Sequence, residues 1–516
     1  MNSYIYNLGL LFNKLASGNE SIALRFIDET TITYNVLEVY SNKIANYLLD
    51  MGITQNNVVA IFNNKSLESY SIMIACLKIG AIYTNIDHNS PVERLNKMIQ
   101  QCNPTIFFTF TDNINRLTDT NISKVHVCDY ACANFKKELD TYSSIIPENV
   151  YNVTGDTPAY LMFTSGSTGF PKGVVITHSN VLNLIEWSKY TYSSSKQDIF
   201  TNINPMHFDN SVFDFYSSLF TGASLIPIPE DLTKNPRLLI KELNKAKPTI
   251  WFSVPSMLVF ALKLRAITTD DLLTLRIVTF GGEGFPKNQL RNLWKFWGDR
   301  VQFINVYGPT ECTCICSSYL VSAEDVESDE LLPLGPIAPN FCHLIINESG
   351  NVVEDESIGE LCIVGPNVGL GYYNNLDKTN EVFVQHPAVT AYKQIMYKSG
   401  DLVRYDKNKG ILHFCGRKDN QIKRMGYRIE LEEIENAFSA LSYVEENAVI
   451  YIKTNDDNGK IIACLRSRKD DDSLILNDLS KFIPSYMLPN EIKYYDHLPK
   501  NQNGKIDRIT LKNECV

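Results

Sequence analysis

The 516-residue sequence lacks the features that usually mark membrane, secreted and nucleic-acid-binding proteins. It has no apolar run of about 18 residues, which is the length that a membrane-spanning helix needs. Its N-terminus, Met-Asn-Ser-Tyr-Ile-Tyr-Asn, lacks the basic-then-apolar pattern of a secretion signal. Its formal charge of −10 argues against a nucleic-acid-binding surface. These absences predict a cytoplasmic protein with neither a membrane nor a nucleic acid as its partner.

The twelve cysteines lack the arrangement of a zinc site. Zinc sites usually combine CxxC pairs with a second pair of ligands at a distance. The tightest group here is Cys312, Cys314 and Cys316, at alternate positions, and a strand would place all three on one face. We expect small buried hydrophobic side chains there rather than metal ligands.

The length and the periodicity predict an α/β protein of more than one domain, because a single core rarely serves more than about 300 residues. Apolar residues at helical spacing, as in 34–49 and 66–79, alternate with short β-branched runs, as in 58–62 and 105–109. This alternation is typical of α/β domains.

After about residue 330 the sequence pattern changes from alternating helices and strands to short strands separated by turns, as in 340–346 and 402–414. We expect a small β-barrel-like part there. A boundary is expected at Gly416-Arg-Lys-Asp419, followed by an amphipathic helix over 429–441 and a strand over 447–452. The predicted division is an N-terminal core of residues 1–417 and a small α+β domain of residues 418–516.

The most informative segment is a loop over Thr164–Gly173 that contains four small hydroxyl residues, three glycines and one lysine. Glycines let the backbone approach a ligand closely, and successive amides with hydroxyls form a nest for phosphate oxygens. Lys172 is followed by Gly173, so the segment is not a Walker loop. A polar hairpin between two buried strands is the alternative interpretation.

Four further motifs follow this loop, and their order is informative. They are Asn305-Val-Tyr-Gly-Pro-Thr-Glu311, Tyr397-Lys-Ser-Gly-Asp401, Gly416-Arg-Lys-Asp-Asn-Gln-Ile-Lys423 with Gly426-Tyr-Arg-Ile-Glu430, and Asn503-Gly-Lys505-Ile-Asp. Together the five motifs resemble those of the adenylate-forming superfamily, and the resemblance covers essentially the whole chain. Within it, Phe208-Asp209-Asn-Ser-Val-Phe213 and Gly281-Gly-Glu-Gly-Phe-Pro286 are similar to the amino-acid-activating branch, which includes D-alanine–carrier protein ligases.

The resemblance implies a reaction in two halves. A carboxylate attacks the α-phosphorus of ATP to give an acyl-adenylate and pyrophosphate, and a thiol then takes the acyl group. Because the first half brings two anions together, it needs concentrated positive charge. Lys505 is expected to supply that charge, Glu311 to bind Mg²⁺ and Thr310 to lie at the α-phosphate. Without the resemblance, the neighbouring residues alone would indicate that Lys505 is a solvated lysine in a surface turn and that Glu311 caps a helix.

The resemblance also assigns residues to each part of ATP. We expect the adenine to contact Tyr307, Asn305 and Gly282, although Tyr307 is also acceptable as a core aromatic residue. We expect the ribose to contact Asp401 and Arg417; Phe414 lacks the hydroxyl that tyrosine often supplies nearby in this superfamily. The β- and γ-phosphates are expected to contact Thr164, Ser165, Gly166, Ser167, Thr168, Gly169 and Lys172.

The amino-acid pocket carried over from the family centres on Asp209, a buried acid that would pair with the substrate ammonium group. A helix N-cap is the alternative role for Asp209. Gly281 is expected to leave space, where D-alanine ligases have a cysteine, and the substrate is expected to be small to medium and mostly apolar. The full set of pocket positions is Asp209, Asn210, Phe213, Phe252, Thr279, Gly281, Val306 and Cys314.

The superfamily has a C-terminal domain that swings between the two half-reactions, and Asp419 matches its hinge. No carrier-protein segment follows Lys505, so the expected acceptor is the phosphopantetheine thiol of a separate carrier protein. The alternatives are an acyl- or aryl-CoA ligase with the same chemistry and a non-catalytic scaffold that keeps the fold.

Overall fold

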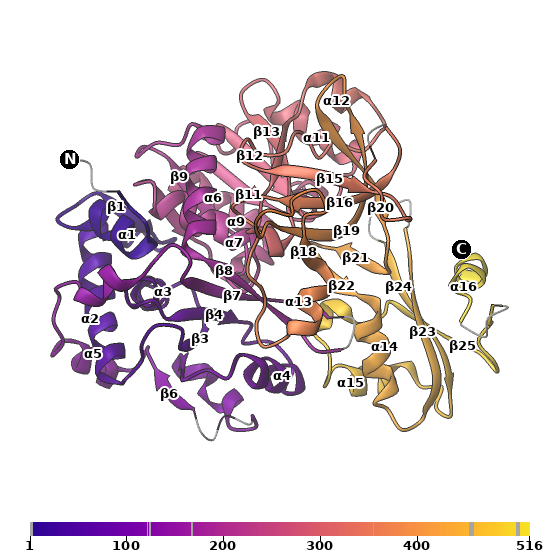
Figure 1. Cartoon of the computed structure of the whole chain (residues 1–516), viewed down its shortest axis with the longest axis horizontal. Helices are drawn as coiled ribbons and strands as arrows, with labels where there is room; N and C mark the ends of the chain where they lie inside the picture. The colour runs from indigo at the N-terminus through magenta and orange to yellow at the C-terminus, as the bar shows by residue number, and fades with distance from the viewer. Residues whose placement is uncertain are drawn as a thin grey trace.

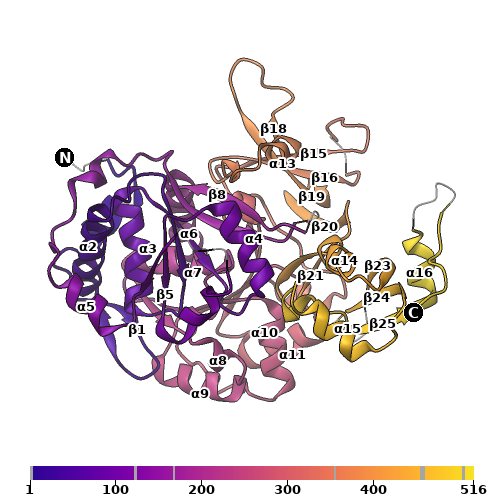
Figure 2. The same cartoon turned by 90° about the horizontal axis from the view of Figure 1, so that it is seen from below.

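Two large sheets of mostly parallel strands form the body of the molecule (Figures 1 and 2). The computed structural model describes residues 4–120, 122, 125–166, 169–353, 356–453, 459–501 and 506–515. In pairing order, sheet A consists of β14 (Ser317–Leu320), β13 (Gln302–Tyr307), β12 (Ile277–Gly281), β11 (Ile250–Ser253), β9 (Ile199–Asn202), β10 (Ser224–Pro227), β1 (Ile22–Arg25) and β2 (Thr31–Thr33). Sheet B consists of β17 (Gly371–Tyr372), β8 (Lys172–Thr177), β7 (Pro158–Thr164), β4 (Ile82–Ile86), β3 (Val58–Phe62), β5 (Ile106–Thr109) and β6 (His126–Asp129).

Helices connect and cover these strands, which confirms the predicted α/β class. They are α1 (Leu8–Ala16), α2 (Tyr34–Asp50), α3 (Leu67–Ile79), α4 (Val92–Cys102), α5 (Ala133–Leu139), α6 (His178–Tyr192), α7 (Asn210–Leu219), α8 (Glu230–Thr233), α9 (Pro236–Ala246), α10 (Pro255–Lys263), α11 (Lys287–Trp297), α12 (Ala323–Glu327) and α13 (Leu376–Val382). Helices α3 and α7 meet in the core, where the rings of Tyr70 and Phe215 stack with centroids 5.8 Å apart. In the parts of the chain that the structure describes, no helix has both the length and the apolar character needed to cross a membrane.

An antiparallel sheet follows the two large sheets, as the short strands after residue 330 predicted. Its strands are β15 (Cys342–Ile346), β16 (Gly359–Val364), β19 (Ile395–Asp406), β18 (Phe383–Gln385) and β20 (Ile411–Arg417). The segment 402–414 forms parts of two strands, because a turn after Asp406 pairs β19 with β20. Backbone bridges from Ser317 to Ile337 and from Gly335 to Leu412 join this sheet to sheet A.

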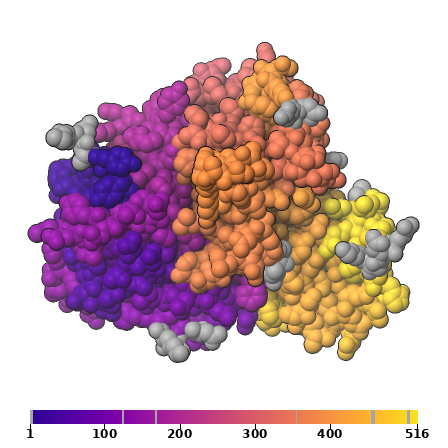
Figure 3. Space-filling model, viewed as in Figure 1, coloured from indigo at the N-terminus to yellow at the C-terminus, as the bar shows by residue number. Residues whose placement is uncertain are grey.

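Residues 421–515 form a C-terminal lobe, which Figure 3 shows beside the main body. It contains the hairpin β21 (Gln421–Arg424) and β22 (Tyr427–Glu430), the sheet β23 (Val444–Ile452), β24 (Lys460–Ser467) and β25 (Glu491–Tyr494), and the helices α14 (Leu431–Ser439), α15 (Asp472–Leu479) and α16 (Arg508–Cys515). Helices α14 and α15 pack on one face of the three-stranded sheet and α16 on the other. Figures 1 and 2 place α16 at the outer edge of the lobe.

Two buried lysines fasten parts of the body together. Lys65, which follows β3 of sheet B, donates to the carbonyl oxygens of Asn202, Ile203 and Ile228 at 2.7, 3.2 and 2.9 Å. These carbonyl groups lie at the ends of β9 and β10, so Lys65 joins sheet B to sheet A. Lys78 of α3 is fully buried and contacts Glu38 of α2 at 2.8 Å.

We predict that Lys78→Met lowers the free energy of unfolding by about 3–5 kcal/mol, because it leaves Glu38 as an unpaired buried charge. Urea unfolding at pH 7 measures this change. Lys43→Met is the matched control, since Lys43 pairs with Asp140, whose side chain is 76% exposed. An exposed pair contributes at most about 1 kcal/mol. Equal losses of unfolding free energy in the two variants would contradict the conclusion that Lys78 compensates the buried charge of Glu38.

Candidate active site

A cavity of about 110 Å³ lies where the sheets of the body meet the C-terminal lobe. Side chains from all of these parts line it, including Asp87, Arg94, Thr164, Ser165, His207, Asp209, Asn210, Phe252, Gly281, Gly282, Val306, Thr310, Cys314, Asp401, Arg417, Lys423 and Arg428. Several of them follow parallel strands of sheets A and B. Ligands of open α/β sheets bind outside the carboxyl ends of such strands. The fold therefore brings twelve of the predicted site residues, from distant parts of the sequence, to the wall of one cavity.

The predicted phosphate loop joins β7 to β8, so it is both a hairpin between buried strands and part of the cavity wall. Ser165 Oγ donates to the carbonyl oxygen of Arg428 at 2.8 Å, and the Gly166 amide donates to Glu433 at 3.3 Å. Lys172 Nζ lies 3.6 Å from Glu430. Polar groups of this loop thus contact the C-terminal lobe. Two other predicted loop residues, Ser167 and Thr168, lie outside the described residues.

Glu311 is fully buried and has a partner at each carboxylate oxygen. Tyr372 donates to Oε1 at 2.7 Å, and Arg428 of the C-terminal lobe donates to Oε2 at 2.8 Å. Burial alone would raise the pKa of Glu311, but the charges of Arg428 and Lys172 outweigh it and lower the pKa to about 2. Glu311 lies in a 3₁₀ turn over Thr310–Cys312, where its side chain is paired rather than capping a helix.

Asp209 lies beside this turn. Thr310 Oγ1 donates to Asp209 Oδ2 at 2.6 Å, and burial raises the pKa of the carboxyl group. Asp209 occupies the N-cap position of α7 but makes no side-chain cap hydrogen bond. The structure gives its Oδ1 no hydrogen bond among the described residues. The carboxylate is therefore free to take a donor from the cavity.

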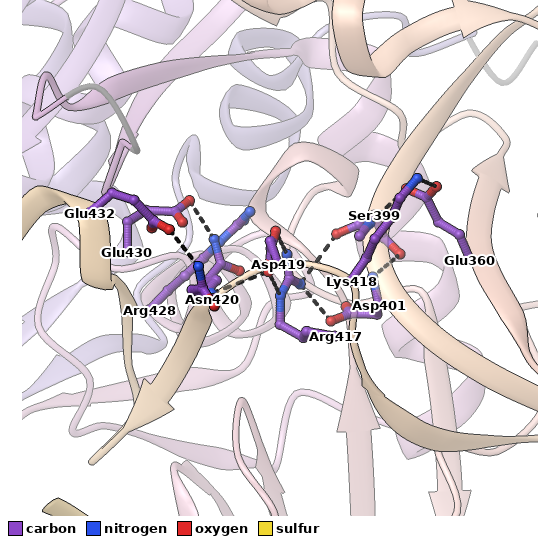
Figure 4. A network of polar contacts seen from close by, with 12 residues as sticks. Glu360, Ser399, Asp401, Arg417, Lys418, Asp419, Asn420, Arg428, Glu430 and Glu432 are labelled. Carbon is purple, nitrogen blue, oxygen red and sulfur yellow. Dashed lines mark hydrogen bonds and ion pairs between the residues drawn. The ribbon is translucent and has the colours of Figure 1, made fainter. Parts of the chain in front are cut away.

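Asp401, Tyr307 and Arg417 form a connected group, part of which Figure 4 shows. Tyr307 donates to Asp401 Oδ2 and Arg417 to Asp401 Oδ1, each at 2.6 Å. Arg417 also holds both carboxylate oxygens of Asp419 at 2.6 Å. The predicted ribose residues and the predicted hinge residue are thus one ion-paired unit.

The predicted adenine residues lie at the same end of the cavity. Asn305 Nδ2 donates to the carbonyl oxygen of Pro333 at 2.8 Å, and Gly282 has a φ of 89°, in the left-handed region that favours glycine. Lys423 Nζ lies 5.6 Å from the centroid of the Tyr307 ring. A lysine of the C-terminal lobe therefore covers the ring that the sequence assigned to the base.

Some of the predicted amino-acid pocket residues line the cavity, and the others are buried behind the lining. Asp209, Asn210, Phe252, Gly281, Val306 and Cys314 line the cavity. Phe213 and Thr279 are fully buried and are not part of the lining. The expectation that Gly281 leaves space was wrong, because a Cβ atom there would overlap the carbonyl oxygen of Val306 and meet its Cγ2 at 2.7 Å.

The three closely spaced cysteines are buried, as expected, but the strand that would align them does not exist. Cys312 ends the 3₁₀ turn, and Thr313 and Cys314 have φ values of 58° and 72°. The chain therefore coils tightly here instead of extending. Cys314 reaches the cavity and Cys316 lies beneath Tyr307, whose carbonyl oxygen is 3.5 Å from its sulfur.

Sequence reasoning gave no role to Lys423, Tyr372 or Glu433. For the segment 426–430, which contains Arg428, it expected only that the domain swing brings it to the thiol tunnel. Arg428 and Lys423 belong to the motifs quoted above, so position within a motif was the available signal. Their charge could not show that they contact Glu311 and Tyr307, which lie more than 100 residues earlier. The predicted catalytic residue Lys505 lies outside the described residues.

The donor set fits magnesium and ATP. Magnesium usually binds one or two carboxylates together with phosphate oxygens, and Glu311 with Thr310 beside it offers this chemistry. The loop amides, its hydroxyl groups and Lys172 are donors suited to a polyphosphate. Asp401 offers a buried carboxylate that can accept from sugar hydroxyl groups.

Comparison with known proteins gives consistent findings. A family model described as AMP-binding enzyme matches residues 12–373. An L-proline–[L-prolyl-carrier protein] ligase from Pseudomonas fluorescens is 32% identical over 494 residues, which cover 94% of each chain. A D-alanine–D-alanyl carrier protein ligase from Bacillus mycoides is 30% identical over 500 residues, which cover 95% of each chain.

Solved structures with the same fold include adenylation proteins. The Vibrio cholerae adenylation domain AlmE, in complex with glycyl-adenosine-5'-phosphate, matches with a TM-score of 0.84 and 23% identity over 100% of this chain and 99% of that chain. NpsA-ThdA, an artificially fused adenylation–PCP di-domain NRPS from Klebsiella oxytoca, matches with a TM-score of 0.82 and 23% identity over 96% and 94%.

We predict that Arg428→Met destabilises the protein at pH 7 by about 3–5 kcal/mol, because Glu311 loses its partner and becomes a buried unpaired charge. The pKa of Glu311 is lowered from 4.5 to about 2, so the pair stabilises the fold above about pH 4.5 and this contribution disappears as the pH falls toward 2. The difference between variant and wild type should therefore be smaller at pH 4 than at pH 7.

Urea unfolding at both pH values measures this difference. Arg404→Met is the control, because Arg404 and Glu356 form an exposed pair at 3.4 Å with side chains 39% and 48% exposed. The control should lose less than about 1 kcal/mol at either pH. A loss in Arg428→Met that does not change with pH would show that Glu311 is not the group affected.

Proposed function

The chain belongs to the AMP-binding enzyme family, as its motifs predicted, and we propose that it is an amino acid–carrier protein ligase. In this proposal ATP and an amino acid give an aminoacyl-adenylate and pyrophosphate. The aminoacyl group then passes to the phosphopantetheine thiol of a separate carrier protein, which releases AMP. We place the reaction in the cytoplasm, where ATP is available.

The observation that carries the proposal is the position of Asp209. Its carboxylate faces the cavity, is oriented by Thr310 and has one oxygen free of partners among the described residues. A substrate ammonium group would stabilise this partly buried charge, whereas a fatty or aromatic acid would leave it unpaired. The carrier-protein ligases that the chain resembles act, by their names, on proline and D-alanine.

The other site residues divide between the two ends of the nucleotide. We assign the β- and γ-phosphates to the loop at Thr164–Gly173 with Lys172, the ribose to Asp401 and Arg417, and the base to Tyr307, Asn305 and Gly282. Glu311 would hold Mg²⁺, which neutralises phosphate charge when it is bound. Oriented donors of this kind stabilise charge that develops at the α-phosphorus and on the leaving pyrophosphate.

The position of the C-terminal lobe bears on the second half-reaction. The Gly426 amide donates to Glu283 at 3.0 Å and Arg428 contacts Glu311, so the segment 426–430 faces the site. Helix α16, which begins three residues after Lys505, lies at the outer edge of the lobe (Figure 1). We propose that this is the arrangement for thiol transfer, and that residues 418–516 rotate about Asp419 to bring Lys505 in for adenylation.

We predict that Asp209→Asn reduces amino-acid-dependent exchange of labelled pyrophosphate into ATP by at least about 100-fold in kcat/KM, because the ammonium group loses its charged partner. The KM for ATP should stay within a few-fold of the wild-type value. Asp231→Asn, which alters an exposed carboxylate of α8, is the control and should exchange like wild type.

Carboxylic acids without an amine serve as the comparison substrates in the same assay. If they stimulated exchange better than amino acids did, an acyl- or aryl-CoA ligase would replace the proposed function. If no carboxylate stimulated exchange, the scaffold alternative would stand.

We also predict that Lys505→Ala lowers the exchange rate by at least about 100-fold, because removal of a charged donor aimed at a transition state typically costs that much. Transfer from a supplied aminoacyl-adenylate to pantetheine should stay within a few-fold of wild type. Lys500→Ala is the control, because Lys500 is in a surface pair with Glu446. Equal losses in both half-reactions would refute the rotation proposed above.

A further inference from the structure

Arg94 of α4 is a buried cation in the wall of the cavity, on the side formed by the loop after β7. It lines the cavity together with Thr164 and Ser165, and only 7% of it is exposed. Its ion-pair partner is Glu433, a buried residue of α14 in the C-terminal lobe. Among the described residues Arg94 makes no other ion pair. A buried cation is stable only beside a negative charge, so Arg94 needs an anion at this point of the cavity.

The Glu433 carboxylate lies between two donors of the main body. Arg94 donates to its Oε1, and the Gly166 amide donates to its Oε2 at 3.3 Å. The two donors come from separate elements, because Arg94 belongs to α4 and Gly166 to the loop that joins β7 and β8. An arginine and a loop amide that share one anion are donors of the kind that bind phosphate groups. Arg94 lies outside the five sequence motifs, so only the fold reveals it beside the loop.

Other donors on this side of the cavity also contact oxygen atoms of the lobe. Ser165 Oγ donates to the carbonyl oxygen of Arg428 at 2.8 Å, and Lys172 Nζ lies 3.6 Å from Glu430. The lobe thus places several oxygen atoms against a group of donors from the body. Their positions show where an anion with several oxygen atoms would fit.

Helix α4 holds Arg94 beside the loop whether or not the lobe is present. Its apolar side chains pack in a core cluster with β3 and β5. Lys97, one turn after Arg94, donates to the carbonyl oxygen of Gly169 at 2.7 Å and so fastens α4 to the loop. Asp87 also lines the cavity, but it contacts His207 at 4.0 Å rather than Arg94. If the lobe turned away, Arg94 would therefore stay in place and lose its counter-charge.

We propose that Arg94 and the Gly166 amide form a subsite for the pyrophosphate part of ATP, and that Glu433 occupies this subsite while the lobe lies as in this structure. The inference rests on the proposed function, in which rotation of the lobe removes Glu433 and the nucleotide then supplies the anion. A guanidinium group can hold two phosphate oxygens at once. Glu433 and pyrophosphate therefore compete for the same donors.

Two single variants test this competition, because they should act in opposite directions on the KM for pyrophosphate in the exchange assay. Arg94→Gln should raise this KM at least about tenfold, because a charge-assisted hydrogen bond to phosphate is lost. Glu433→Gln should lower it at least about threefold, because the competing carboxylate is neutralised and a larger fraction of the protein is open to pyrophosphate. If the ion pair served only to hold the lobe, both variants would shift the KM in the same direction, and the inference would be overturned.

Arg468→Gln is the matched control, because Arg468 forms an exposed pair with Glu445 of the lobe at 3.0 Å. Its KM for pyrophosphate should equal the wild-type value. If Arg94→Gln does not fold, Arg94→Lys takes its place, since it keeps the positive charge. Its KM should rise at least about threefold, because an ammonium group lacks the planar fork that holds two phosphate oxygens.

Calorimetric binding of pyrophosphate to the full chain, with Mg²⁺ present, separates this inference from the proposed function. Wild-type affinity in Arg94→Gln, with amino-acid-dependent exchange intact, would overturn the inference alone. If no carboxylate stimulated exchange, the proposed function would fail. Weaker binding of pyrophosphate by Arg94→Gln than by wild type would then still support the subsite, and equal binding would overturn it as well.

Discussion

The carboxylate of Glu311 is fully buried, and a buried carboxylate is stable only beside a positive charge. In this structure the charge comes from Arg428, which belongs to the C-terminal lobe, while Glu311 belongs to the main body. The two parts of the molecule therefore complete each other electrostatically across the cavity. Two more ion pairs join the same parts with the signs reversed, since the lobe's Glu430 approaches Lys172 and its Glu433 pairs with Arg94.

These contacts use the groups that we assign to ATP. The Gly166 amide and Lys172 face carboxylates of the lobe, where the proposed function places phosphate oxygens. Arg428 lies on Glu311, where the proposal places a cation, and Lys423 covers Tyr307, where it places the base. At the positions that the proposal gives to the phosphates and the metal ion, the lobe thus presents charges of the same sign as a metal-bound nucleotide would. In the proposal, the same donors and acceptors of the main body therefore contact either the C-terminal lobe or the nucleotide.

The sequence predicted the α/β class and twelve of the residues that line the cavity, because ordered motifs identify both. It could not predict contacts that depend on packing between distant segments. Thr310 reaches Asp209 across 101 residues, and only the fold brings them together. At Gly281 the sequence shows a missing side chain, whereas the structure shows that Val306 fills the volume. The left-handed turn at Cys314 likewise had no signal, since cysteine at positive φ is not a preference of the residue.

Lys65 restricts how the two large sheets can move relative to each other. Its ammonium group is held by three carbonyl oxygens at the ends of β9 and β10, and its backbone continues directly from β3 of sheet B. Sliding of one large sheet past the other would break these hydrogen bonds and leave the buried Lys65 without its partners, so this contact resists such sliding. The rotation that we propose would then take place where the chain leaves β20 for the C-terminal lobe.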